Sequence, residues 1–331
     1  MANISTDELK TLSERALVNA GLREQDAAIV ADHYWENELS GKASHGMVRV
    51  IEAVKSAQKN HAAQQDAEIE HDSGSLLRFN AKSQNGAVAG HTAMTESIKR
   101  AKEHGIALVG IHNYIASSGS MAYYLRRFVD EGLIAFMGCN SIALVSPPGS
   151  KERMIGTNPI GVCMPGENGQ HLIADLATSA YAYGKIMVHK AKGEPVPEGV
   201  MIDETGSPST NPEDADDGAI LPLAGYKGFS LGLMIELMAG PLIGAKAIKK
   251  DLCDEDGLFI IAIDPKAMGH APFYKDIAEA LSKIKNAERI PGIDHISVAG
   301  ERSASTLHKN LAAGEIDVAD TTLEKLRELA K

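Results

Sequence analysis

The chain has 331 residues, a length that favours roughly two or three packed subdomains over one simple core. Hydrophobic residues make up 44% of it and charged residues 23%, which excludes the disordered and fibrous classes. The net charge of −11 repels polyanions and acidic membrane surfaces, and no apolar run is long enough to span a bilayer. We therefore expect neither nucleic acid nor a membrane as a partner.

Cysteine usage and the N-terminal sequence bear on the compartment. The three cysteines, Cys139, Cys163 and Cys253, are odd in number and widely spaced. They predict neither a disulfide framework nor a zinc site, so no metal is expected. The N-terminal stretch MANISTDELK has no apolar signal core. A reducing cytoplasm is the simplest compartment for such a chain.

Two helices are predicted at the N-terminus. Ser5 and Glu8 have the spacing of a capping box, and leucines and alanines follow at helical intervals. Asp26 opens a second helix, which should end near Gly41 because glycine commonly follows the last helical residue. His45, in the stretch ASHGMVRV, is therefore expected just beyond a helix end.

Strands and helices alternate through the middle of the chain. The pattern predicts strands at 76–80, 106–112 and 133–138, and helices at 86–105, 121–132 and 180–191. The sequence therefore predicts mixed α/β structure. Residues 193–218 are rich in proline, glycine and acidic residues, which predicts a long surface excursion. Whether it is a lid, a dimer contact or solvent-exposed packing stays open.

The C-terminal third is predicted to be helical around one strand. Helices are expected at 229–245 and 274–287, a strand at 258–264, and a capped helix at 321–331. The longest apolar stretch, 229–247, predicts a buried helix.

Short motifs of the commonest enzyme classes are missing. No GxGxxG follows a strand, and GxxxxGKS/T, GxSxG and HExxH do not occur. His45 can act as a general acid or base near neutral pH, and Arg49 can bind a carboxylate through its planar guanidinium. The alternative is a surface histidine in a loop, with Ser44 capping the next helix.

Three further residues each have two interpretations. Asp175 ends an apolar strand, where it can hold a ribose hydroxyl or cap the following helix. Lys227 precedes an apolar helix in GYKGFSLG, where it can meet a phosphate or be a solvated lysine in a turn. Arg302, in the stretch AGER, presents the same two alternatives.

Seven segments in order resemble the type-2 malate/L-lactate dehydrogenase family, which also contains ureidoglycolate, sulfolactate and diketogulonate oxidoreductases and cyclic-imine reductases. They are ASHGMVRV, NSIALVSPPGSKERMIGTNPIGVCMPG, DLATSAYAYGKI, PEGVMIDETGSPSTNP, LPLAGYKGFSLGLMIELMAGPLIGA, FIIAIDPKAMG and AGERS. The resemblance spans nearly the whole chain. It implies hydride transfer between NAD or NADP and a 2-oxo or 2-imino acid.

The resemblance also implies an architecture. The fold would be a nicotinamide-binding fold unlike the Rossmann domain, which is consistent with the missing GxGxxG. A central, mainly antiparallel sheet domain at 73–224 would bind the cofactor. It would be flanked by a helical region at 1–72, which packs with the C-terminal part, and by a helical region at 225–331. Similar proteins form homodimers.

Site residues follow from the same resemblance. His45 matches the histidine that exchanges a proton with the substrate oxygen, Ser44 would orient it, and Arg49 would contact the substrate. Thr157 and Asn158 would shape the floor of the substrate site, although a structural turn explains them equally well. The residues that fall where the family binds the dinucleotide are Ser118, Gly119, Ser141, Asp175, Leu176, Ala177, Lys227, Gly228, Gly300, Glu301 and Arg302. Within that set, Asp175 would lie by a ribose, while Lys227 and Arg302 would neutralise phosphate charge.

The sequence departs from the family pattern in three places. Many members have a second histidine where this chain has Ser117, and His112 lies several residues too early to replace it. Tyr226 stands where a histidine is frequent, and the usual proline after the SHGxxR pattern is absent. These departures favour His45 as the proton donor and leave the substrate and the choice between NAD and NADP open.

Three functions are therefore considered. The first is an NAD(P)-dependent dehydrogenase of a small 2-oxo or 2-hydroxy acid such as malate or lactate. The second is a cyclic ketimine reductase, which keeps the carboxylate clamp but reduces C=N. The third, suggested by the missing second histidine, is a protein that binds a nucleotide or metabolite without turnover.

Overall fold

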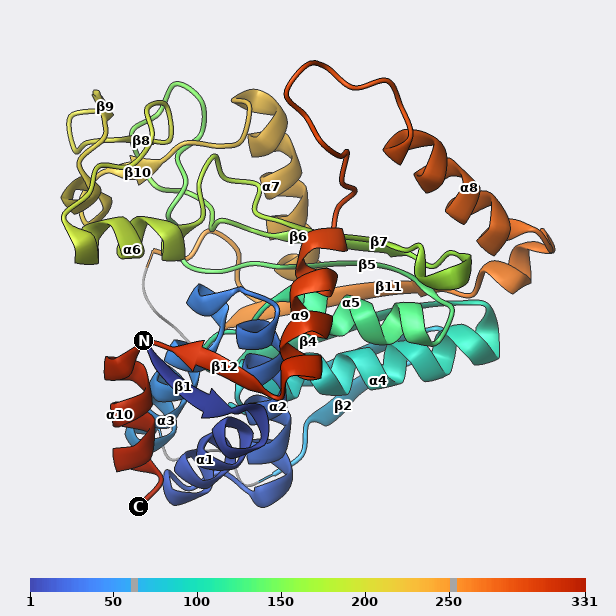
Figure 1. The fold of residues 1–331 in the computed structure, drawn as a ribbon, viewed down its shortest axis with the longest axis horizontal. Helices are drawn as coiled ribbons and strands as arrows, with labels where there is room; N and C mark the ends of the chain where they lie inside the picture. The colour runs from blue at the N-terminus through green and yellow to red at the C-terminus, as the bar shows by residue number, and fades with distance from the viewer. Residues whose placement is uncertain (61–64, 251–254) are drawn as a thin grey trace.

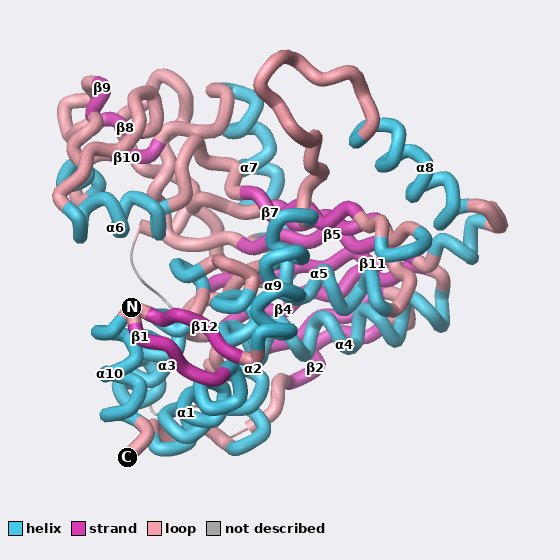
Figure 2. The backbone as a smooth tube through the Cα atoms, in the orientation of Figure 1, coloured by secondary structure: helices cyan, strands magenta, loops and turns pink. Residues whose placement is uncertain are grey.

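A seven-stranded sheet forms the centre of the protein (Figures 1 and 2). The structure, a computed structural model, describes residues 1–60, 65–250 and 255–331. The strand order is β2-β3-β4-β11-β5-β6-β7. The strands are β2 Glu68–Asp72, β3 Leu76–Asn80, β4 Ile106–Tyr114, β5 Ile134–Cys139, β6 Ile160–Met164, β7 Leu172–Leu176 and β11 Asp256–Ile263.

The pairing directions decide which strand ends meet. Only β3 and β4 pair in parallel, and the other neighbours are antiparallel. Because β11 runs against both β4 and β5, and β6 against both β5 and β7, the strands β3, β4, β5 and β7 share one direction. Their carboxyl ends therefore meet at one edge of the sheet, which we call the carboxyl edge.

Helices cover both faces of this sheet. On one face, α4 Gly86–His104 and α5 Met121–Asp130 bury residues such as Met94 and Phe128 against the strands. On the other face, α7 Tyr226–Ala239 packs Ile235 against Phe259 of β11. The predicted mixed α/β fold, with a central and mainly antiparallel sheet flanked by helices, is confirmed.

A second core joins the two ends of the chain. It contains α1 Thr6–Asn19, α2 Glu24–Leu39, α3 Met47–Asn60 and α10 Asp320–Leu329, and β1 Ala2–Ser5 pairs with β12 Glu315–Val318. Ser5 accepts a hydrogen bond from Glu8 N at 3.1 Å, as the capping-box spacing predicts. Figure 1 shows both termini in this helical cluster, at the lower left. α8 Phe273–Lys285 and α9 Glu301–Ala313 complete the long helices.

The segment 193–218 is more than an exposed excursion. Together with 219–220 it forms a small sheet, β10-β8-β9, from β8 Met201–Ile202, β9 Pro208–Ser209 and β10 Ala219–Ile220. Met201 and Ile220 are buried there beside Ile186 of α6 Tyr183–Lys192. Its apolar residues thus have a core of their own, which the polar composition of the segment conceals.

The prediction of a buried helix at 229–247 is wrong in extent and in burial. The α-helix begins at Tyr226 and ends at Ala239, and a short 3-10 turn, η4 Pro241–Ile243, follows. Its buried face contains glycines, Ile235 and Glu236, while Leu231, Met234 and Leu237 are 42%, 40% and 48% exposed. A sequence that is apolar on all sides does not indicate which side the sheet covers.

Some predictions lie outside what the structure tests. The division at 72 and 224 stays a prediction, although β2 and β11, from the two outer regions, belong to the central sheet. Cys139 and Cys163 are free and buried, and Cys253 lies outside the described residues. Within the described ranges, no helix is long and apolar enough to cross a membrane.

Candidate active site

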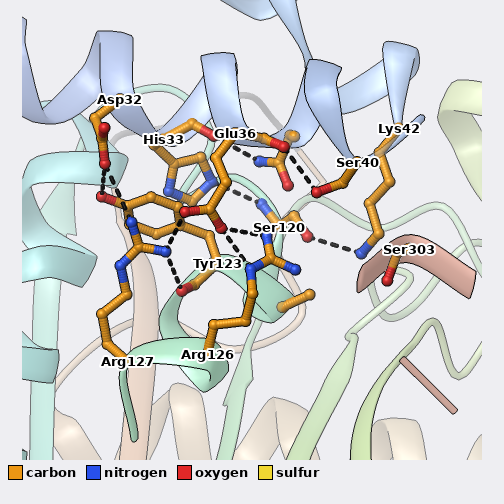
Figure 3. A network of polar contacts seen from close by, with 12 residues as sticks. Asp32, His33, Glu36, Ser40, Lys42, Ser120, Tyr123, Arg126, Arg127 and Ser303 are labelled. Carbon is orange, nitrogen blue, oxygen red and sulfur yellow. Dashed lines mark hydrogen bonds and ion pairs between the residues drawn. The ribbon is translucent and has the colours of Figure 1, made fainter. Parts of the chain in front are cut away.

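Ion pairs between α2 and α5 fix the helix that leads to His45 (Figure 3). Glu36 of α2 accepts hydrogen bonds from both Arg126 and Arg127 of α5, each at 2.5 Å. Asp32 accepts the Tyr123 hydroxyl at 2.8 Å, and Arg127 stacks over the Tyr123 ring at 3.6 Å. The second half of α2 is therefore held against α5.

The SHG motif forms a turn directly after α2. The 3-10 turn η1 Ala43–His45 precedes α3, and the carboxylate of Glu38 caps α3 by accepting Met47 N at 2.7 Å. A Cβ atom on Gly46 would lie 1.9 Å from that carboxylate, so a larger residue there would displace the cap. Ser44 does not cap α3, because Glu38 does, and this part of the alternative for Ser44 is wrong.

Ser44, His45 and Arg49 are brought into contact. Ser44 Oγ lies 3.1 Å from His45 Nδ1, and Arg49 Nε donates to Ser44 O at 3.0 Å. Arg49 Nη1 also pairs with Glu52 at 2.5 Å. His45 Nε2 and Arg49 Nη2 have no protein partner in the described part of the chain. Two polar atoms of the cluster are therefore open to a ligand.

The environment of His45 disfavours its charged form. Burial, and next the positive charge of Arg49, lower the pKa of His45 to about 4. The nearby carboxylate of Asp175 opposes this shift. An anion that neutralises Arg49 would remove one of the two main causes and raise the pKa of His45.

Asp175, the residue before the last of β7, receives three donors on one oxygen. Its Oδ2 accepts Lys42 Nζ at 2.8 Å, Ser120 Oγ at 2.8 Å and Ala122 N at 3.2 Å. Because Ala122 lies in the first turn of α5, Asp175 caps α5 and not the helix that follows it. The predicted cap on the helix that follows Asp175 is wrong, because α6 has no side-chain cap and long-range packing places Asp175 at the start of α5.

Residues predicted to bind the dinucleotide follow several strands at the carboxyl edge. Ser118 and Gly119 follow β4, and Ser118 Oγ contacts the Cys139 thiol at the end of β5. Ser141 follows β5 and is partly buried. Leu176, the last residue of β7, is 52% exposed, and Ala177 comes directly after it. The strand directions explain why segments so distant in sequence meet here.

Thr157 and Asn158 lead into β6 at the same edge. Asn158 is fully buried, and its amide donates to Gly232 O at 2.9 Å and to Glu236 Oε2 at 2.6 Å. Thr157 O accepts from Thr178 N at 3.0 Å. Both residues therefore stabilise the carboxyl edge through hydrogen bonds within the protein.

Lys227 and Arg302 lie in the first turns of α7 and α9. Neither side chain has a hydrogen-bond or ion-pair partner within the described ranges, and neither helix has a side-chain cap. Gly228, next to Lys227, is buried against Leu223 O. Two open helix N-termini, each with an unpaired cation, provide sites where phosphate charge is favourable.

The residues Gly300 and Glu301 fix the start of α9 beside β7. Gly300 has φ +93°, and a Cβ atom there would lie 2.8 Å from Ile173 O of β7, so glycine is required. The carboxylate of Glu301 is occupied by Lys285 at 3.3 Å and by Val298 N at 3.2 Å. The side chain of Glu301 thus links α9 to Lys285 at the end of α8. Of the described residues 300–302, Arg302 is the one whose charge has no partner.

Sequence reasoning missed several residues of this region. Lys42 and Ser120 meet Asp175 across 133 and 55 positions of the chain. Buried Glu236 holds Asn158 from α7. No local pattern signals such pairs. Ser117, at the position of the second family histidine, is exposed, and His112 pairs with Glu70 at 2.9 Å instead.

Comparisons with known proteins agree on one family. The family description "Malate/L-lactate dehydrogenase" matches residues 4–327. The malate/(S)-sulfolactate dehydrogenase of Methanothermus fervidus is 32% identical over 99% of this chain and 97% of its own. The Δ1-pyrroline-2-carboxylate reductase of Ancylobacter novellus is 34% identical over 88% and 87%. The crystal structure of malate dehydrogenase from Entamoeba histolytica has a TM-score of 0.92 at 24% identity, covering 99% and 97%.

The matching fold and the whole-length matches define the class of the protein, which is an oxidoreductase. More particularly, the chain belongs to the malate/L-lactate dehydrogenase family, and the family resemblance of its sequence motifs is confirmed.

Proposed function

We propose that this protein transfers a hydride between NAD or NADP and a small 2-oxo or 2-hydroxy acid such as malate or lactate. The observation that carries the proposal is the contact of Ser44, His45 and Arg49 beside Asp175, at the edge where the strands end. Relatives named for malate and sulfolactate support an acid as the substrate.

His45 is the proton donor and acceptor in this proposal. Reduction of a carbonyl leaves negative charge on its oxygen, which His45 Nε2 neutralises by donating a proton. The Ser44 hydroxyl orients the ring from the Nδ1 side, because its oxygen accepts a hydrogen bond from Nδ1–H both before and after Nε2 gives up its proton. In oxidation, the same Nε2 removes the proton of the hydroxyl group.

Arg49 binds the substrate carboxylate and links binding to proton supply. Its free Nη2 provides the donor, and Nη1 joins it once Glu52 is displaced or shared. The carboxylate also offsets the charge of Arg49 that lowers the pKa of His45. Substrate binding therefore raises the pKa of His45 towards the range in which it donates a proton. Thr157 and Asn158 form the floor of the site.

The residues present fit a nicotinamide dinucleotide, which supplies or accepts the hydride when bound. Lys227 and Arg302 hold its phosphates, because both are unpaired cations at helix N-termini. Asp175 accepts a hydroxyl or amide donor of the cofactor on Oδ1. Ser118, Gly119, Ser141, Leu176, Ala177, Gly228, Gly300 and Glu301 shape the rest of the cofactor site. Binding on a mainly antiparallel sheet, unlike a Rossmann domain, agrees with the missing GxGxxG.

A homodimer forms through the exposed face of α7 in this proposal. Leu231, Met234, Leu237 and the following Leu242 are 40% to 53% exposed, and together they make an apolar face larger than scattered single residues would. Leu237→Glu should convert a dimer to a monomer in sedimentation experiments, whereas Leu311→Glu, at a comparably exposed leucine of α9, should not. Equal behaviour of the two variants contradicts this interface.

An initial-rate screen tests the reaction. NADH and NADPH are combined with pyruvate, oxaloacetate, other 2-oxo acids and piperideine-2-carboxylate, with His45→Ala run in parallel. Turnover of an acid by the unchanged protein, and a loss of about a hundredfold or more in His45→Ala, support the proposal. No absorbance change with any substrate, together with nucleotide binding, would instead favour the non-catalytic alternative.

A cyclic ketimine reductase is the second candidate, favoured by the relative named for Δ1-pyrroline-2-carboxylate. It uses the same arginine for the carboxylate and the same histidine for the proton on nitrogen. A kcat/KM for piperideine-2-carboxylate above that for every oxo acid would identify this reaction as the main one.

A further inference from the structure

The carboxylate of Asp175 is held asymmetrically. Lys42, Ser120 and the Ala122 N–H all donate to Oδ2, while Oδ1 has no donor among the residues that the structure describes. The Asp175 side chain is 17% exposed. One oxygen is therefore saturated inside the protein and the other is left as a fixed acceptor for a ligand.

Lys42 closes a triangle of hydrogen bonds around this carboxylate. Its ammonium donates to Asp175 at 2.8 Å and to Ser120 Oγ at 3.0 Å, and Ser120 in turn donates to Asp175. Figure 3 shows Lys42 extending from the end of α2 towards Ser120. Ser120 is itself anchored, because its N–H donates to buried His33 Nε2 at 3.0 Å. The triangle thus joins the loop before His45, the start of α5 and the end of β7.

We propose that Lys42 is a positioning residue for nicotinamide-nucleotide binding: it holds Asp175 in the rotamer that presents Oδ1 to a hydroxyl or amide donor of the cofactor. This inference rests on the proposed function. A carboxylate free to rotate would share its two oxygens between protein and cofactor donors, whereas three donors on Oδ2 fix its orientation before the ligand arrives.

Lys42 has a second effect, on the charge of the acceptor. Burial alone would raise the pKa of Asp175, but the charge and hydrogen bond of Lys42, with Ser120 and Ala122 N, hold it below its usual value. Among the described residues, His45, His33 and Cys139 are further titratable groups that interact with Asp175. Because these remain in a Lys42 variant, loss of the ammonium raises the pKa of Asp175, and protonation then removes an acceptor at higher pH.

Nucleotide titrations of the whole protein test the inference. NADH and NADPH binding is followed by nicotinamide fluorescence from about pH 5 to about pH 8 for the unchanged protein, Lys42→Met, Lys42→Arg and Lys190→Met. Lys190 is the matched control: its side chain is 26% exposed against 28% for Lys42, and it pairs with Glu213 and Asp216 far from Asp175 in the sequence.

Lys42→Met should weaken nucleotide binding about tenfold and move its acidic limit to higher pH. Lys42→Arg should bind close to normally, because it restores a cationic donor, and Lys190→Met should be unchanged. A purely structural ion pair would lower the melting temperature without moving the pH limit. Unchanged binding and pH dependence in a folded Lys42→Met protein would overturn the inference.

Ser120→Ala serves if Lys42→Met does not fold. It removes one donor to Oδ2 at small volume cost and should weaken binding about threefold in the same direction. Normal binding by a folded Ser120→Ala protein would overturn the inference in that case. If the unchanged protein binds neither nucleotide, the proposed function fails and the inference with it. Binding by the unchanged protein with no effect of these variants removes only the role of Lys42.

Discussion

Two polar clusters lie at the carboxyl edge of the same sheet, and their hydrogen bonding differs. The buried cluster consists of Asn140, Asn158, Glu236 and Lys249, and the His45 cluster of Lys42, Ser44, His45, Arg49 and Asp175. In the buried cluster, Glu236 accepts from both asparagines and from Ile248 N. Its carboxylate therefore faces protein donors on both oxygens.

The His45 cluster is bonded on one side only. His45 uses Nδ1 for Ser44, Arg49 uses Nε and Nη1, and Asp175 uses Oδ2. The opposite atoms have no protein partner in the described part of the chain. The Glu236 carboxylate is bonded on both oxygens and holds the fold, although Asn158 Oδ1 beside it has no partner among the described residues, whereas the half-bonded His45 cluster is prepared for a ligand.

The largest expected effect is on the buried cluster. Glu236→Ala removes one acceptor from each of two amides and the acceptor of the Ile248 N–H, in a region from which water is excluded, so the free energy of unfolding should fall by about 3 kcal/mol. Urea denaturation measures this difference. Glu52→Ala, at an exposed carboxylate that pairs with Arg49, is the control and should change stability by less than about 0.5 kcal/mol. Equal effects of the two variants would refute the distinction between the clusters.

Arg49→Met should leave the fold stable and weaken substrate binding. The variant removes the charged donor for the carboxylate, which is expected to raise KM by about tenfold to a hundredfold, with unfolding shifted far less than in Glu236→Ala. Initial rates with the best acid of the screen and a parallel melt measure both. Arg49→Lys retains the charge without the planar fork and should be intermediate. A normal KM in Arg49→Met contradicts the carboxylate clamp.

The pH dependence of stability distinguishes the clusters in a third way. The folded-state pKa of His45 is lowered to about 4 from 6.5, so the unfolded chain binds the extra proton between these values. His45 therefore makes stability fall as pH falls through that window, by about 2.5 kcal/mol. His45→Gln lacks this loss, and its stability relative to the unchanged protein should rise by that amount from pH 6.5 to 4. Because both proteins contain the other titratable groups, His33 included, the contributions of those groups cancel in the difference between the two stabilities. A pH-independent difference would mean that His45 titrates normally.

Much of the fold could be predicted from local sequence. The Ser5 cap, the end of α4 before Gly105 and the core strands follow from spacing and apolar patterns, because each depends on neighbours within a few residues. The burial of α7 could not, since an apolar surface on all sides does not reveal the covered face. The same limit hid the packed core of 193–218, whose few apolar residues are separated by polar ones.

In the candidate site, too, local sequence could predict some residues, whereas the roles of others depend on long-range packing. Ser44, His45 and Arg49 lie within six positions, so one motif carries all three. Asp175 was singled out, but its cap on α5 and its bond to Lys42 depend on packing between β7, α5 and the loop after α2. Glu236 interrupts the apolar stretch 229–247, and nothing local gives it a role. Its contacts with Asn140, Asn158 and Ile248 N explain why a carboxyl group is buried there.

The smallest expected effect concerns Ser44, whose hydroxyl touches only the Nδ1 side of His45. Ser44→Ala leaves Nε2 and Arg49 in place, so kcat should fall about fivefold while KM for the acid stays nearly constant. Because the hydroxyl oxygen accepts from Nδ1–H in both the protonated ring and the neutral ring, its loss removes orientation more than it changes the pKa of His45. The pH profile of kcat should therefore keep its shape at a lower height. Single-turnover rates in both directions check this. A selective loss in reduction alone would instead assign Ser44 to stabilising the protonated ring.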